Sequence, residues 1–160
     1  KERLLASDVF QAAFLKALKA AATGNGLCYH KPSPTQPRTH KGSSMTIQHY
    51  QPTARLSDAT VANGFVFLAG QVPENEDADV TAQTANVLAQ IDAILAACGS
   101  DKAHICEAVI YLPDLADYAG MNAAWDAWVQ PGATPARACV QAALANPKWK
   151  VEIKLTAVQK

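Results

Sequence analysis

Arg137 is the residue in this sequence whose chemistry most needs an explanation. It lies in residues 134–140, where Pro135 favours an extended backbone and the residues that follow are small and apolar. We therefore expect a buried strand with a guanidinium at its centre. A guanidinium stays charged at working pH and offers five donors in a rigid fork. Because a charge removed from water must be paired, Arg137 requires a carboxylate from the protein or from a ligand.

Glu152 is the first candidate for the partner of Arg137. Residues 150–158 alternate apolar and polar side chains and predict a final strand. If residues 146–149 are the turn of a hairpin, Arg137 lies near Thr156, with Glu152 about 13 Å further along the same face. An internal salt pair stays open, because the register can shift by a residue or two. Otherwise the gap suits a small acid, held bidentately by the guanidinium while the glutamate orients a water or moves a proton.

The elements that must position these residues begin with a hairpin. Asn63-Gly64 between residues 59–62 and 65–69 is a strong hairpin signal. Residues 66–69 are apolar throughout, so we expect that strand to be covered on both faces. Gly70 then opens a loop in which the backbone comes close to another group. A short strand over residues 46–50 precedes the hairpin.

Two helices follow from the apolar periodicity. The first has a stripe from Val80 to Cys98, ends at Gly99, and is preceded by acidic residues matched to the helix dipole. The second is expected to be capped by Asp114 in a capping box with Asp117. Its stripe also includes two tryptophans, interpreted as core or interface mass, and one asparagine that needs a polar partner. Those stripe residues are Leu115, Tyr118, Met121, Asn122, Trp125 and Trp128.

With a strand over residues 105–112 between the helices, the order is strand hairpin, helix, strand, helix, strand hairpin. This order predicts an α+β domain with two helices on one face of a mostly antiparallel sheet. The other face is too apolar to remain bare, so we expect oligomerisation. His104, Cys106 and Glu107 lie close in sequence but alternate between strand faces, so we predict no metal site there.

Charge and composition limit the function classes. Residues 1–45 carry seven Lys/Arg and two Asp/Glu, a net charge of +5, whereas residues 46–160 carry seven and twelve, a net of −5. The acidic charge of the patterned part argues against nucleic-acid binding. No apolar run is long enough for a membrane span. The four cysteines are scattered and are read as reduced thiols of a cytoplasmic protein.

The N-terminal residues are read as an extension rather than as part of the fold. An amphipathic helix over residues 1–23 and a proline-rich linker over residues 27–44 are expected, with the folded domain at residues 45–160. Residues 1–44 are taken as a remnant of processing or upstream translation. Organellar targeting or partner binding by this arm stays open.

Several segments of the chain resemble the RidA (YjgF-type) reactive-intermediate deaminases, and in detail the YoaB-like branch. Those segments are Gly70-Gln71-Val72-Pro73, Gln83-Thr84-Ala85-Asn86, Asp117-Tyr118 with Met121-Asn122, Trp125-Asp126-Ala127-Trp128, residues 135–140, Asn146-Pro147-Lys148 and Val151-Glu152-Ile153. The resemblance covers residues 45–158.

The resemblance implies a homotrimer of chorismate-mutase-like subunits, with a central barrel and clefts between subunits. It implies hydrolysis of 2-imino or enamino acids to 2-oxo acids and ammonia, without metal or cofactor. The family's carboxylate-binding arginine falls on Arg137 and its water-activating glutamate on Glu152. Its other cleft residues fall on Cys139, which we read as lining rather than as a nucleophile, and on Gly70; Ala138 and Asn122 complete the expected ligand-binding set.

Two departures from the family pattern bear on activity. Ala69 stands where the archetype has a hydroxyl before the loop glycine, and Leu56 stands where it has an aromatic residue. Both changes make the cleft less polar or less filled. A sensor that holds a 2-oxo or other short acid through Arg137 without turnover is therefore the alternative function.

Overall fold

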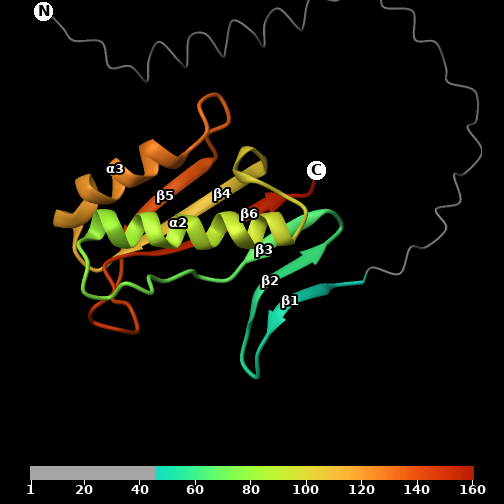
Figure 1. The fold of residues 1–160 in the computed structure, drawn as a ribbon, viewed down its shortest axis with the longest axis horizontal. Coiled ribbons are helices and arrows are strands. Elements are labelled where there is room, and N and C mark those ends of the chain that lie inside the picture. Colours follow the sequence, from blue (N-terminus) through green and yellow to red (C-terminus); the bar gives the residue numbers. More distant parts are fainter. Residues whose placement is uncertain (1–45) are drawn as a thin grey trace, which may run out of the picture. The chain divides into compact units, whose positions relative to one another are not determined.

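The computed structural model describes residues 46–160, which form a six-stranded sheet with two α-helices across one face (Figure 1). This is the predicted α+β class. The helix expected over residues 1–23 and the linker over 27–44 lie outside the described residues. No helix in the described part is both long and apolar enough to cross a membrane.

The predicted hairpin is confirmed. Strands β2 (Ser57–Ala62) and β3 (Phe65–Leu68) are antiparallel, with Ala62 opposite Phe65. The turn residues Asn63 and Gly64 have φ values of 50° and 78°, as a two-residue turn with left-handed backbone requires. Strand β1 (Gln48–Pro52) pairs with β2 and starts two residues later than expected.

The first predicted helix is α2 (Val80–Ala97). It begins where the Asp79 carboxylate accepts a hydrogen bond from the Ala82 amide at 2.8 Å. It ends before Gly99, whose φ is +77°. The predicted stripe is the buried face, and it contains one further residue, Gln83, that the apolar periodicity did not include. The buried residues of α2 are Val80, Gln83, Thr84, Val87, Leu88, Ile91, Ile94 and Leu95.

The start of the second helix differs from the prediction. Strand β4 (Ile105–Leu112) is followed by a 3₁₀ turn (Leu115–Asp117), and α3 spans Tyr118–Trp128. Asp114 caps the 3₁₀ turn through the Ala116 amide at 2.9 Å. Asp117 makes no side-chain capping bond, so the expected capping box is absent. The reason is that the chain enters α3 through a tight turn, which places the Asp117 backbone in a helical conformation rather than an extended one.

The predicted C-terminal hairpin is wrong. The strand order is β1-β2-β3-β6-β4-β5, so β6 (Glu152–Val158) lies between β3 and β4, and β5 (Ala136–Gln141) is an edge strand parallel to β4. The alternate residues of β6 that face the helices are buried to 2% exposure or less, as expected for a strand that is paired along both edges. These residues are Ile153, Leu155 and Ala157. The turn at residues 146–149 therefore belongs to a connection that passes β4.

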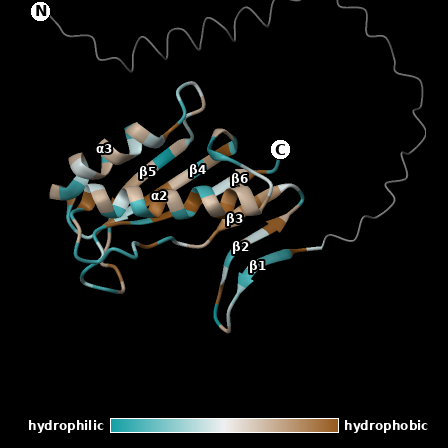
Figure 2. Ribbon diagram, in the orientation of Figure 1, coloured by the Kyte–Doolittle hydropathy of each residue, from teal (hydrophilic) through white to brown (hydrophobic). Residues whose placement is uncertain are grey.

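One face of the sheet is packed and the other is bare in the single chain. Hydrophobic residues occur along the strands that lie beneath α2 (Figure 2), and their side chains belong to the buried core. On the opposite face Phe65 and Phe67 are 44% and 43% exposed, with ring centroids 6.1 Å apart. The expectation that residues 66–69 are covered on both faces is thus wrong for a single chain. It follows that β3 presents two exposed aromatic side chains on the face that the helices leave free.

Candidate active site

Arg137 is exposed, which corrects the prediction of a buried strand around it. Its strand β5 is paired along one edge only, and most of its side chains are accessible. The guanidinium carbon lies 5.1 Å from the centre of the Trp125 ring on α3, a cation–π contact. Among residues 46–160 the ion pairs join other side chains, and none includes Arg137. The predicted internal carboxylate partner is therefore absent from the described chain.

Glu152 lies on the other side of the molecule, against Gly70. A Cβ built on Gly70 would be 2.9 Å from Glu152 Cδ and 3.2 Å from Cγ, and closer still to Oε1. The adjacent backbone fixes this approach, since Gln71 N donates to Ile153 O at 2.8 Å and Ile153 N donates to Gln71 O at 3.0 Å. The loop glycine thus does come close to another group, and that group is the Glu152 side chain.

Arg137 and Glu152 do not share a face of the sheet, contrary to the hairpin prediction. Arg137 is level with the buried Ala108, on the side that the helices cover. Glu152 is level with Tyr111, on the bare side, and β4 separates the two strands. Three residues along the sheet and two strand spacings across it place their Cα atoms about 14 Å apart. The Arg137 guanidinium and the Glu152 carboxylate of one chain therefore cannot contact the same small acid.

Cys139 follows Arg137 on the same face of β5. It is half-buried and packs against the core. Burial raises the pKa of the Cys139 thiol, and the Arg137 charge offsets only part of this effect. A thiol with a raised pKa is a weak nucleophile near neutral pH. Ala138 between them is exposed and is level with Val109, on the bare face.

Asn122 lies on α3, one helical turn before Trp125. Its Oδ1 atom is buried and has no hydrogen-bond partner within the described chain. A buried acceptor without a donor is unfavourable. The polar partner expected from the sequence is therefore not supplied by residues 46–160.

The predicted residues thus form two groups. Gly70 and Glu152 lie together on the bare face, whereas Arg137 and Cys139 lie on the helix-covered face beside α3, which carries Asn122. Trp125 is a neighbour of Arg137 that the sequence did not identify. Its spacing within an apolar stripe indicated core packing, which is correct at 4% exposure but incomplete.

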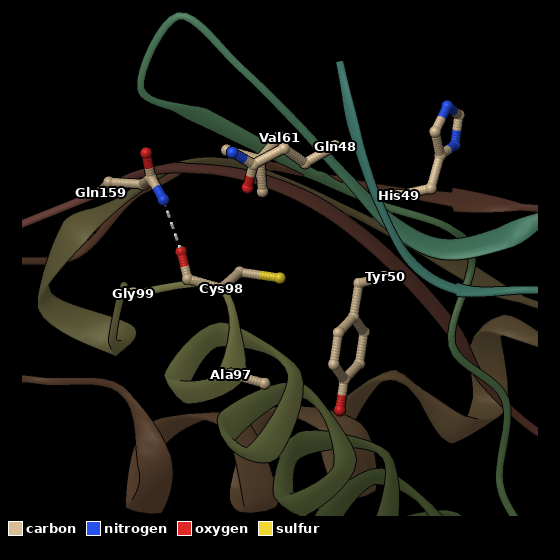
Figure 3. Close-up of a pocket in the computed structure, with 8 residues that line it drawn as sticks. All are labelled: Gln48, His49, Tyr50, Val61, Ala97, Cys98, Gly99 and Gln159. Atoms are coloured by element: carbon tan, nitrogen blue, oxygen red, sulfur yellow. Dashed lines mark hydrogen bonds between the residues drawn. The ribbon is translucent and has the colours of Figure 1, made fainter. Parts of the chain in front are cut away.

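The hollow in Figure 3 is separate from both groups. It has a volume of about 340 Å³ and lies between β1 and the C-terminal end of α2. Cys98 lines it, and burial raises the pKa of that thiol. Gln159 Nε2 donates to Cys98 O at 2.9 Å, whereas the His49 ring points away (Figure 3). None of the predicted site residues lines this hollow, and no group of three or more metal-ligating side chains is found within residues 46–160.

Comparisons with known proteins cover the described part of the chain. The family model described as Endoribonuclease L-PSP matches residues 46–159. The RutC family protein YoaB of Escherichia coli is 54% identical over 113 residues, which are 71% of this chain and 98% of that protein.

Solved structures agree. A YjgF-family protein of Neisseria meningitidis is 60% identical with a TM-score of 0.71, over 72% of this chain and 97% of that one. A putative translation initiation inhibitor of Salmonella typhimurium is 51% identical with a TM-score of 0.67, over 72% and 99%. As its resemblance to the RidA proteins and their YoaB-like branch predicted, the chain belongs to the Endoribonuclease L-PSP (YjgF/RutC) family.

Proposed function

We propose that this protein hydrolyses reactive 2-imino and enamino acids to 2-oxo acids and ammonia, in clefts between the subunits of a homotrimer. The observation that carries the proposal is the unpaired, exposed guanidinium of Arg137. A guanidinium held over the Trp125 ring is already restrained, so it loses less freedom when it binds a carboxylate through two hydrogen bonds.

The separation of Arg137 and Glu152 supports a cleft built from two chains. The two groups lie on opposite faces about 14 Å apart, so each needs a neighbour to complete a site. The bare face, with its exposed phenylalanines, offers the apolar surface that a second and third copy would cover. Such an arrangement brings the Gly70 and Glu152 group of one subunit to the Arg137 group of the next.

The chemistry requires no strong nucleophile. An iminium carbon is already electrophilic, so a held carboxylate, an oriented water and a proton acceptor suffice. Arg137 holds the substrate carboxylate, and the Glu152 carboxylate accepts a proton from the water whose oxygen attacks C2. The nitrogen then takes up the proton held by Glu152, and the C–N bond breaks. Ammonia leaves as the C2 hydroxyl gives its proton back to the Glu152 carboxylate and becomes the carbonyl. An enamine reacts after it takes up a proton on carbon to give the imine.

The remaining predicted residues have supporting roles. Cys139 lines the cleft beside the carboxylate, and its raised thiol pKa suits a lining role rather than a nucleophilic one. The side chain of Ala138 is on the opposite face of β5, so Ala138 contributes only its backbone there. Asn122 has an unpartnered Oδ1 that becomes an acceptor for a substrate N–H only if its side chain turns toward the cleft, because the atom is buried in the single chain. The free thiols Cys98, Cys106 and Cys139 fit a reducing compartment such as the cytoplasm.

A carboxylate sensor without turnover is the alternative. Leu56 is 53% exposed where the archetype carries an aromatic residue, so this part of the cleft is less filled in a single chain. Ribonuclease activity, which the family's description names, is less attractive because the described residues carry a net charge of −5.

The decisive experiment generates 2-aminoacrylate in the presence of the full-length protein and follows the release of pyruvate. Acceleration that is lost in Glu152→Gln supports hydrolysis, and measurable 2-oxo acid binding without acceleration supports the sensor. The two-chain cleft is tested by refolding Arg137→Ala and Glu152→Gln together. Because one cleft in four then combines both intact residues, about a quarter of the activity should return. No recovery would place both residues in the same chain's site.

A further inference from the structure

Gln83 on α2 is a polar side chain in the middle of the core. It is 0% exposed, and its amide has four hydrogen-bond partners, of which three carbonyl oxygens share the two N–H groups. Its Nε2 donates to Glu76 O at 3.0 Å, Ala78 O at 3.2 Å and Lys148 O at 3.1 Å. Its Oε1 accepts from Lys150 N at 2.8 Å. A fully bonded buried amide fixes the groups around it, since any displacement leaves a polar atom unpaired.

These bonds join two loops that are about seventy residues apart in sequence. One is the acidic segment before α2, and the other is the segment that leads into β6. Two side-chain contacts join the same loops from outside: Asn146 Nδ2 donates to Glu76 Oε1 at 2.7 Å, and Lys148 Nζ to Asp77 Oδ1 at 2.9 Å. The acidic residues therefore do more than complement the helix dipole, which was their predicted role, and only Asp79 caps the helix.

The segment held in this way ends two residues before Glu152. Lys150 is fixed by Gln83, and Ile153 is fixed by its two backbone hydrogen bonds to Gln71. Between these points the chain contains only Val151, which is fully buried, and Glu152. The backbone of Glu152 is thus held from both sides, and its side chain is directed against Gly70.

We propose that Gln83 is a positioning residue for Glu152, acting through the backbone of Lys148 and Lys150. This inference rests on the proposed role of Glu152 in imine hydrolysis. A displacement of about 1 Å in a group that orients a water can reduce a rate on the order of a hundredfold. Gln83 contacts neither the proposed substrate nor Arg137, so it should affect turnover and not carboxylate binding.

The first test compares Gln83→Met with Thr84→Val in the intact protein. Methionine keeps the length of the side chain but cannot form the hydrogen bonds that the amide makes to the two loops. Thr84 is equally buried, and its hydroxyl donates only to Val80 O of its own helix, at 2.7 Å. We expect Gln83→Met to lower kcat at least about tenfold with KM unchanged, and Thr84→Val to lower the melting temperature with kcat unchanged. An equal loss of kcat in both variants would mean that Gln83 acts only through stability, and an unchanged kcat in Gln83→Met would also overturn the proposal.

The second test uses Gln83→Glu, which makes the positioning titratable. The introduced carboxyl is surrounded by three carbonyl oxygens and is buried, so its pKa is raised. When protonated it donates to one carbonyl and accepts from Lys150 N, and when ionised it is repelled by the carbonyls. Activity should therefore approach that of the wild type at low pH and fall as pH rises, with an additional limb in the pH–rate profile. A profile parallel to the wild type would contradict the proposal.

A measurement without turnover separates this inference from the proposed function. If the wild type hydrolyses no imine, the proposed function fails, while the position of Glu152 can still be observed. The ¹³C carboxyl resonance of Glu152, assigned by its loss in Glu152→Gln, should move in Gln83→Met and stay in place in Thr84→Val. A resonance that is identical in Gln83→Met and the wild type would overturn the positioning role by itself.

Discussion

The Glu152 carboxylate occupies the space that a side chain on Gly70 would need. Gly70 lies in the loop that follows β3 and Glu152 is the first residue of β6, and the backbone hydrogen bonds between Gln71 and Ile153 set their separation. Glycine is therefore required at this position for the sake of a neighbouring carboxylate, not for an unusual backbone angle. The proposed water-activating group thus lies directly against backbone that carries no side chain.

Gly70→Ala should displace the Glu152 side chain and lower kcat by at least about tenfold. The methyl group would meet Oε1, Cδ and Cγ of Glu152, and the carboxylate is the part that can move. Initial rates of pyruvate release, with oligomeric state measured alongside, check this expectation. Shortening the acid in a Gly70→Ala, Glu152→Asp double variant should relieve the contact. The loss of kcat in the double variant should therefore be smaller than the combined losses of the two single variants.

Gly132→Ala is the matched control for that variant. Gly132 has a φ of +81° and open space around it, so alanine there strains the backbone without meeting another group. It should reduce the stability by about 1 kcal/mol and leave kcat unchanged. If both glycine variants lose turnover equally, the effect of Gly70→Ala is general destabilisation.

Arg137→Ala should abolish 2-oxo acid binding while the fold persists. Arg137 is exposed and its contact is the Trp125 ring, which at an accessible site contributes about 0.5–1 kcal/mol. Calorimetric titration with pyruvate and a thermal melt measure the two properties on the same sample. Arg137→Lys should bind weakly, because an ammonium cannot hold a carboxylate through two parallel bonds. A variant that unfolds would instead assign Arg137 a structural role.

The C-terminal topology could not be predicted from local signals alone. The turn residues at 146–149 indicated a hairpin, and the turn does form, with Trp149 N donating to Asn146 O at 3.1 Å. What the sequence also contained was a strand, a helix and a strand over residues 105–141, which is the crossover that a parallel pair requires. Interpreted as such a crossover, residues 105–141 predict that β5 pairs with β4. The position between β3 and β4 is then free for β6.

The site was identified through resemblance, and its geometry could not be derived from one chain. The helical spacing of apolar residues correctly predicted the buried face of α2, and their alternation correctly predicted that of β6. Gln83 was missed because a polar residue inside an apolar stripe gives no signal until its four hydrogen-bond partners are known. The burial of Arg137 was also predicted wrongly. Whether a strand lies at the edge of a sheet, and is therefore exposed, depends on strand order rather than on composition.

Asp101 should make a pH-dependent contribution to stability. Hydrogen bonds from His104 and Lys160 hold the pKa of its carboxyl well below the usual range. Because the folded-state pKa is depressed, this contribution is present above the unfolded pKa of about 3.9 and is lost as pH falls below it. Asp101→Asn should therefore lower the melting temperature at pH 7, and the difference should narrow below about pH 4. Asp126→Asn, which removes an exposed acid from α3, is the control for the loss of one negative charge.

Phe67→Asp should dissociate the proposed trimer. Phe67 and Phe65 stack on the face of the sheet that the helices leave bare, and burying a phenylalanine contributes about 1.5–3 kcal/mol. A carboxylate at this position would have to be desolvated in each of three subunits, which an interface does not tolerate without a partner. Sedimentation should then show monomers, with Arg137 and Glu152 intact but imine hydrolysis lost, because neither group has its neighbour.

The matched control for Phe67→Asp is Ala89→Asp, which adds the same charge on an exposed position of α2 on the helix side of the sheet. It should leave both the oligomeric state and turnover unchanged. Mixing Phe67→Asp monomers with the wild type should not restore activity to the variant chains. A trimer that persists in Phe67→Asp would assign subunit contact to another surface. Full turnover by its monomers would mean that a single chain contains the whole site, which the positions of Arg137 and Glu152 on opposite faces argue against.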